Sequence, residues 1–164
     1  LEPSGGPTAR FARVALPFDD PAWDTFGLLK EAYLALDVAL AEAMGRVTEV
    51  DRSILDLLIR VARSPDATAR PTDLARDLSL VPSHITRCLD EAERRGLVTR
   101  TPHPGDRRSK LVVLAPEGES LLRRLEPALA EVQRRLIHGL LEEDEVATLE
   151  DLLRRLRDAA RARE

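Results

Sequence analysis

Residues 71–114 read PTDLARDLSLVPSHITRCLDEAERRGLVTRTPHPGDRRSKLVVL, where two helix-like patterns precede two strand-like runs. The apolar positions of the two helices recur at helical spacing: Leu74, Ala75 and Leu78 in the first, and Ile85, Cys88, Leu89 and Ala92 in the second. Pro71 and Pro82 suit the first position of a helix, where a missing N–H costs no hydrogen bond, and Gly96 suits the residue after a helix end. The turn between the helices is therefore short, about Ser79 to Val81.

The segment after Gly96 changes to a strand pattern. Residues 97–101 and 110–114 are rich in β-branched and apolar side chains, which predicts a β-hairpin. Residues 102–109 between them contain two prolines, a glycine and two adjacent arginines, which predicts a stiff basic loop. Two helices joined by a tight turn and followed by such a hairpin form a winged helix. We therefore predict a mainly α fold with a small β-hairpin wing (α+β), a winged helix-turn-helix.

The second of these helices has a polar face that suits DNA. A helix that follows another so closely crosses it steeply and leaves one face exposed. That face holds short polar groups and arginines, namely Ser83, His84, Thr86, Arg87 and Arg94. Such groups are typical of a helix that reads the major groove. We predict that Ser83 and Thr86 bind phosphates rather than bases.

Two residues of this face have a second interpretation. Arg87 either donates two hydrogen bonds to a guanine or pairs with Asp90 or Glu91 on its own helix. His84 either contacts a base or phosphate or is an exposed polar residue in contact with solvent.

The predicted wing adds further DNA contacts. Arg107 and Arg108, with Lys110 beside them, are placed to reach a phosphate backbone or a minor groove. RNA and single strands are disfavoured, because all five aromatic residues lie at or before Tyr33 and none is on the proposed reading surface to stack on bases. A winged helix used as a protein-interaction module, without specific DNA binding, stays open as an alternative.

Three motifs resemble the wing of the MarR family of transcriptional regulators: RGLVTR (95–100), GDRRS (105–109) and LVVLAPEG (111–118). The resemblance implies a homodimeric regulator, a repressor, that binds a pseudo-palindromic double-stranded operator and responds to a small aromatic or anionic effector. It also implies that Asp106 orients a wing arginine through an ion pair. Two positions depart from the family pattern. Val81 stands where a Ser or Asp helix cap is usual, and Ala115 stands where Thr is usual.

A subgroup resemblance suggests a ligand pocket. Family members that respond to urate share one Trp, one Asp and two Arg, and this chain has Trp23, Asp56, Arg87 and Arg100 in the same order. The resemblance implies that a purine anion competes for arginines that would otherwise partner Asp56. The alternative is that Asp56 forms a structural ion pair with an arginine and that Trp23 anchors the N-terminal arm.

The flanks of the winged helix predict dimerisation. We divide the chain into an N-terminal arm (1–23), an N-terminal dimerisation helix (24–48), the winged helix DNA-binding lobe (49–115) and C-terminal dimerisation helices (116–164). The terminal helices have leucine-rich faces, including Leu149, Leu152, Leu153 and Leu156. These faces are larger than one small lobe can cover, so we expect them to pack against a second copy.

Composition agrees with a DNA-binding globular protein. The 164 residues are 43% hydrophobic and carry a net charge of −4. Residues 70–110 nevertheless hold nine Arg and Lys against six Asp and Glu, while both flanks are acidic. Basic charge is thus concentrated on the proposed DNA-reading part, where phosphate binding needs it.

Other functional classes find little support in the sequence. The three histidines lack metal-ligand spacing, no glycine-rich phosphate loop is present, and no catalytic triad is suggested, so we predict no metal, no cofactor and no enzymatic activity. Cys88 lies on an apolar stripe without a second cysteine, which favours a structural role over redox sensing. No apolar run is long enough to span a membrane, and we expect a cytoplasmic protein.

Overall fold

The structure is a computed structural model that describes residues 22–162, apart from the side chains of Ala22 and residues 106–108. The predicted N-terminal arm thus lies almost wholly outside the described residues. The chain divides into two compact units between Leu36 and Asp37, within helix α1 (Ala22–Gly45). In the described part of the first unit most side chains of α1 are exposed, and Trp23 packs edge-on against Phe26 with ring centroids 6.3 Å apart.

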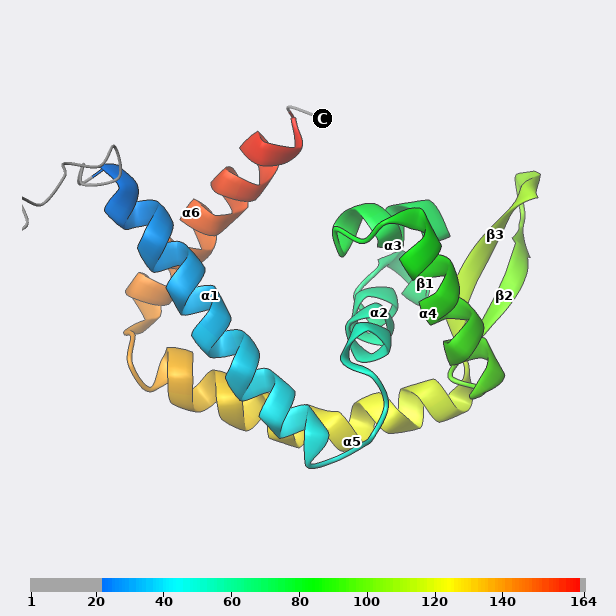
Figure 1. Cartoon of the computed structure of the whole chain (residues 1–164), viewed down its shortest axis with the longest axis horizontal. Coiled ribbons are helices and arrows are strands. Elements are labelled where there is room, and N and C mark those ends of the chain that lie inside the picture. Colours follow the sequence, from blue (N-terminus) through cyan, green and yellow to red (C-terminus); the bar gives the residue numbers. More distant parts are fainter. Residues whose placement is uncertain (1–21, 163–164) are drawn as a thin grey trace, which may run out of the picture. The chain divides into compact units, whose positions relative to one another are not determined.

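The second unit contains the predicted winged helix (Figure 1). Its elements follow in the order α2 (Arg52–Ala62), a 3₁₀ turn (Pro65–Ala67), β1 (Thr68–Ala69), α3 (Pro71–Asp77), α4 (Pro82–Arg94), β2 (Val98–His103), β3 (Asp106–Leu114), α5 (Pro116–Gln133), a π-helical turn (Arg134–His138) and α6 (Glu143–Arg161). The strands form one antiparallel sheet in the order β1-β3-β2. The mainly α fold with a β-hairpin wing is therefore confirmed.

The core of this unit lies between α2, α3, α4, the sheet and the first half of α5. Its most deeply buried side chains come from every one of these elements: Leu55, Leu57, Leu58, Leu74, Leu89, Val98, Val112, Leu121 and Leu125. The apolar stripe predicted for α4, which includes Cys88, is buried as expected. This burial fixes α4 on one side only, and its other face stays available for a ligand.

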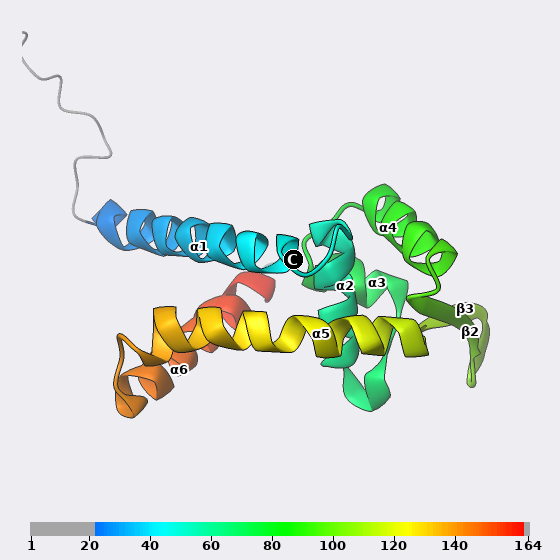
Figure 2. The same cartoon turned by 90° about the horizontal axis from the view of Figure 1, so that it is seen from below.

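The hairpin differs from the sequence-based expectation in length. The predicted loop 102–109 is mostly strand: Pro102 pairs with Lys110, the register then shifts, and His103 pairs with Asp106 on either side of a turn at Pro104 and Gly105. Pro102 is tolerated because β2 is an edge strand, where the missing N–H removes no ladder hydrogen bond. Figures 1 and 2 both show this hairpin projecting from the lobe beside α4.

Sequence periodicity also missed strand β1. It comprises only Thr68 and Ala69, which pair with Val113 and Val112. Two residues are too few to show the alternation that predicts a strand. The pairing makes β3 the central strand and so stiffens the base of the wing.

The first turn of α5 lies very close to the start of the wing. A Cβ atom on Gly118 would come within 2.1 Å of the backbone oxygen of Leu97, so only glycine fits here. The Ala115 N–H donates to the same oxygen at 3.0 Å. The hairpin and α5 are thereby held together through one carbonyl group.

Candidate nucleic-acid interface

Helix α4 presents the predicted reading face. Ser83, Thr86, Arg87 and Arg94 are exposed and His84 is half-buried. The Thr86 hydroxyl donates to the Pro82 carbonyl oxygen at 2.9 Å, so part of its hydrogen-bonding capacity is used within the helix. Val81 occupies the N-cap position without a side-chain cap bond and is 63% exposed. The start of α4 therefore carries an apolar group among polar ones.

Two carboxylates of α4, Glu91 and Asp90, bind arginines that lie near the end of the helix and on β2. Glu91 accepts two hydrogen bonds from Arg94, at 2.7 and 2.6 Å, and one from Arg95 at 2.5 Å. These hydrogen bonds lower the pKa of Glu91 to about 2. Asp90 accepts a hydrogen bond at 2.6 Å from Arg100 on β2.

Arg87 stands apart from this network. The sequence suggested an ion pair of Arg87 with Asp90 or Glu91, but neither forms, because both carboxylates hold other arginines. Within residues 22–162 no hydrogen bond or ion pair engages the Arg87 guanidinium. Arg87 is thus an exposed cation on the first half of α4, on the face away from the core. Such a side chain can hydrogen-bond a base edge without first breaking an internal pair.

The wing is organised around a histidine that sequence reasoning missed. The Gly105 N–H donates to Nδ1 of His103 at 3.0 Å, and Nη2 of Arg70 lies 2.9 Å from its Nε2. The Arg70 side chain, from the residue that precedes α3, thus lies beside the wing turn, but Nε2 cannot accept from it while Nδ1 of a neutral ring accepts from Gly105. No sequence pattern marks this proximity. Lys110 is exposed on β3. The side chains of Asp106, Arg107 and Arg108 lie outside the described residues, so their predicted roles stay predictions.

A cavity of about 520 Å³ lies between the reading helix and the wing. Thr86 and Leu89 of α4, Arg100 of β2, Lys110 of β3 and Arg70 line it, among others. Three residues predicted from the sequence as DNA or ligand contacts, Thr86, Arg100 and Lys110, thus meet around one space. Its cationic and apolar lining suits an aromatic anion.

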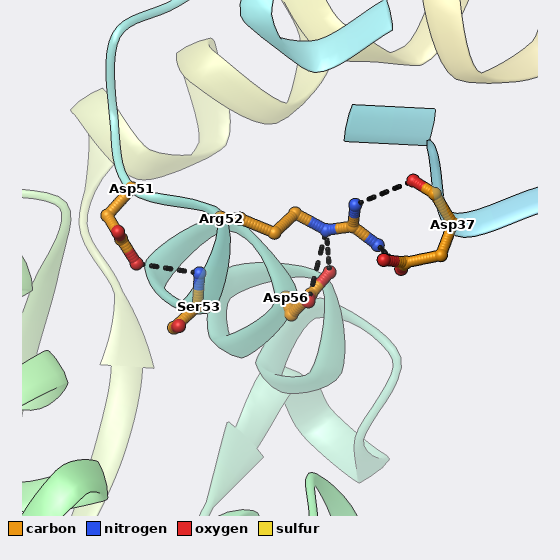
Figure 3. A network of polar contacts seen from close by, with 5 residues as sticks. All are labelled: Asp37, Asp51, Arg52, Ser53 and Asp56. Carbon is orange, nitrogen blue, oxygen red and sulfur yellow. Dashed lines mark hydrogen bonds and ion pairs between the residues drawn. The ribbon is translucent and has the colours of Figure 1, made fainter. Parts of the chain in front are cut away.

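Two of the residues predicted as a purine pocket, Asp56 and Arg100, bind other residues, and Figure 3 shows the partners of Asp56. Asp56 accepts two hydrogen bonds from Nε of Arg52, at 3.0 and 3.1 Å, and Arg52 also binds Asp37 at 2.8 Å. Arg100 binds Asp90, and Glu93 lies 3.5 Å from it. Within the described residues no contact joins Asp56 to Arg87 or Arg100. The fourth member, Trp23, lies in the first unit, and the other three lie in the second.

Cys88 has the environment of a core residue. Burial, reinforced by the Asp51 carboxylate, raises the pKa of its thiol, which disfavours the reactive thiolate.

Within residues 22–162 no group of His, Cys, Asp or Glu is arranged to hold a metal ion. None of the helices described is long and apolar enough to cross a membrane.

The lobe of α2, α3 and α4 with the β2–β3 hairpin defines a winged helix-turn-helix protein. Residues 52–110 match the model of the MarR family, which confirms the resemblance of the motifs at 95–100 and 105–109. The Multiple antibiotic resistance protein MarR of Salmonella typhimurium is 34% identical over 86 residues, 52% of this chain and 60% of that protein. The Escherichia coli protein of that name is 33% identical over 90 residues, 55% and 62% of the two chains. This chain therefore spans about 60% of the length of these relatives.

Solved structures extend the similarity over most of the chain. A mutant MarR from E. coli in complex with operator DNA has a TM-score of 0.71 and 26% identity, and covers 87% of this chain and 99% of its own. Sco3205 from Streptomyces coelicolor, a MarR family transcriptional regulator in complex with DNA, has a TM-score of 0.71 at 24% identity and covers 90% and 91%.

Proposed function

We propose that this chain is a sequence-specific regulator of transcription that binds double-stranded DNA. Helix α4 enters the major groove, and the β2–β3 wing reaches the adjacent backbone or minor groove. The observation that carries the proposal is the exposure of Arg87, which has no partner within residues 22–162, on a helix whose opposite face is locked into the core. Relatives of the same fold in complex with DNA support this role.

The proposal includes a homodimer with the domain division given above. Leu149, Leu152, Leu153 and Leu156 of α6 are 39–56% exposed in the single chain, as are several large apolar side chains of α1. Apolar faces of this extent are typical of association surfaces. In a two-fold dimer two copies of α4 lie about 34 Å apart, one turn of DNA, so the operator is pseudo-palindromic. We place the protein in the cytoplasm. Binding across a promoter would block transcription there, which would make the protein a repressor.

An aromatic anion is the proposed effector, and the cavity between α4 and the wing is its proposed site. Arg70 and Lys110 supply positive charge there, and Leu89 supplies an apolar wall. A ligand bound against α4 would change DNA affinity if it fitted the free and bound arrangements differently. BpsR of Bordetella bronchiseptica, whose DNA binding is regulated by 6-hydroxynicotinic acid, has the same fold, and PcaV of S. coelicolor has been solved with its natural ligand.

The purine pocket of Trp23, Asp56, Arg87 and Arg100 is the competing ligand hypothesis. It requires Asp56 to leave Arg52 and Arg100 to leave Asp90. An aromatic anion in the cavity beside α4 requires no exchange at Asp56. This difference makes the two hypotheses separable by ligand chemistry.

Footprinting on the DNA that flanks the gene tests the function. A protected pseudo-palindrome supports the proposal, whereas an interaction module would show neither protection nor salt-dependent retention on heparin. Titrating the complex with urate, xanthine, salicylate and 6-hydroxynicotinate then tests the effector. Release by the phenolic and pyridine acids supports the cavity beside α4, and release by the purines alone supports the quartet.

A further inference from the structure

A second cationic cavity lies at the end of α3, away from the reading face. Four arginines gather there around one carboxylate, Asp77: Arg60 of α2, Arg76 of α3, and Arg157 and Arg161 of α6. Nη2 of Arg161 is 3.1 Å from Oδ1 of Asp77, and Nε of Arg76 and of Arg60 are 3.6 and 3.7 Å from its two oxygens. Asp77 is only 20% exposed, so the charges face one another in a partly closed space.

These contacts leave N–H donors of the four arginines without a hydrogen bond to Asp77. In the described part of the chain no hydrogen bond joins Asp77 to any of them, and its buried Oδ1 has no hydrogen-bond partner. Each guanidinium carries five N–H donors in a planar fork. The distances show attraction between charges, while the donors that would bind an oxyanion are not occupied by Asp77.

The charges around this cavity do not balance. Asp73 pairs with Arg76 at 3.1 Å and Asp158 pairs with Arg157 at 2.8 Å, both from outside the lining. Arg60 and Arg161 are then left to share Asp77. An excess of positive charge remains even when all three of these carboxylates are counted.

We propose that this cavity binds a small oxyanion of two or more negative charges, a phosphate or polycarboxylate group. Arginine forks match both groups through paired hydrogen bonds. The cavity volume, about 380 Å³, lies within the range of small-molecule sites. The Ser79 side chain adds a hydroxyl to the lining. The inference is independent of DNA binding, because none of these residues lies on the reading face of α4.

Bound oxyanion would connect two parts of the chain. Arg157 and Arg161 belong to α6, and Arg60 and Arg76 belong to the winged helix lobe. An anion held by both pairs would replace mutual repulsion of the arginines with attraction. The lobe and the C-terminal helix would therefore be held together more firmly in its presence.

Calorimetric titration of the full chain in phosphate-free buffer tests the site. Pyrophosphate and citrate are the probes, and acetate and chloride at matched ionic strength are the controls. We expect saturable binding of one or both probes, and the one that binds more tightly identifies phosphate or carboxylate as the preferred group. Equal signals from chloride or acetate would overturn the proposal, because they would reduce the effect to ionic screening.

Variants locate the site. The pair R157Q and R161Q should weaken probe binding about tenfold or more, since charged hydrogen bonds are removed. The control pair R154Q and R155Q removes the same charge from the same helix, outside the lining, and should leave affinity unchanged. D77N removes the internal competitor and should tighten binding. Equal affinity of the two arginine pairs would overturn the proposal, and so would weaker binding by a folded D77N protein.

Discussion

Replacing Arg87 with alanine should weaken binding to the specific operator by about 1–3 kcal/mol, roughly 5- to 150-fold. The structure places the effect toward the upper end of this range. Arg87 is exposed and holds no internal ion pair among the described residues, so no internal bond offsets the base interaction that the substitution removes. Folding should change little, because exposed substitutions of this kind usually stay within about 0.5 kcal/mol.

Arg94→Ala is the matched control. It removes the same side chain from the same face, but Arg94 is held by Glu91 through two hydrogen bonds and would have to leave them to reach DNA. Its removal should therefore cost severalfold less affinity. Fluorescence anisotropy with the operator and with a duplex of altered guanines, each over a series of salt concentrations, separates the effects. Removing a base interaction lowers affinity only for the operator, whereas removing a phosphate interaction lowers it for both duplexes. Equal effects of the two substitutions would refute the assignment of Arg87 as the base-reading arginine.

Other expectations concern the wing, the dimer and the fold. Changing Arg107 and Arg108 together to alanine should flatten the salt dependence of DNA affinity, by about 0.9 in the log–log slope for each phosphate that the wing no longer neutralises, with the dimer intact in sedimentation. Deleting residues 143–164 should give a monomer in sedimentation and abolish tight operator binding; a dimer would contradict it. Gly118→Ala should destabilise the protein by about 1–3 kcal/mol in denaturant unfolding, because the new Cβ would meet a backbone oxygen 2.1 Å away. The pKa of Glu91 is lowered from 4.5 to about 2, so its stabilising contribution is full above about pH 4.5 and is lost as the pH falls toward 2; Glu91→Gln should remove that acid dependence from unfolding curves.

Local patterns predicted the elements, and their limits explain the errors. The 0, 3, 4, 7 spacing from Ile85 to Ala92 identified the buried face of α4, because burial repeats with the helical period. The length of the wing was wrong because Pro102 and Gly105 are turn signals in isolation, whereas an edge strand accepts a proline. Strand β1 was missed since two residues contain no period.

Ion-pair partners were less predictable than elements, because they depend on folded geometry. Asp56 accepts a hydrogen bond from Arg52, four residues away on its own helix, and Arg52 also donates to Asp37. Arg100 found Asp90 across the junction between α4 and β2. The sequence shows that such charges are present, but several arginines lie near each carboxylate along the chain, so sequence separation does not select the partner. Only the packing of the folded chain selects among them.

These pairings change what the local charge of the lobe means for DNA binding. Counted along the chain, residues 70–110 have an excess of basic residues. In the folded lobe, Glu91 and Asp90 hold Arg94, Arg95 and Arg100 through short hydrogen bonds. The cations left on the first half of α4 are therefore fewer than composition suggests, and Arg87 is the one that faces outward without a partner among the described residues. Sequence-independent attraction to phosphates is weakened by the same carboxylates that leave this arginine available, so the arrangement favours discrimination between base sequences over general affinity for DNA.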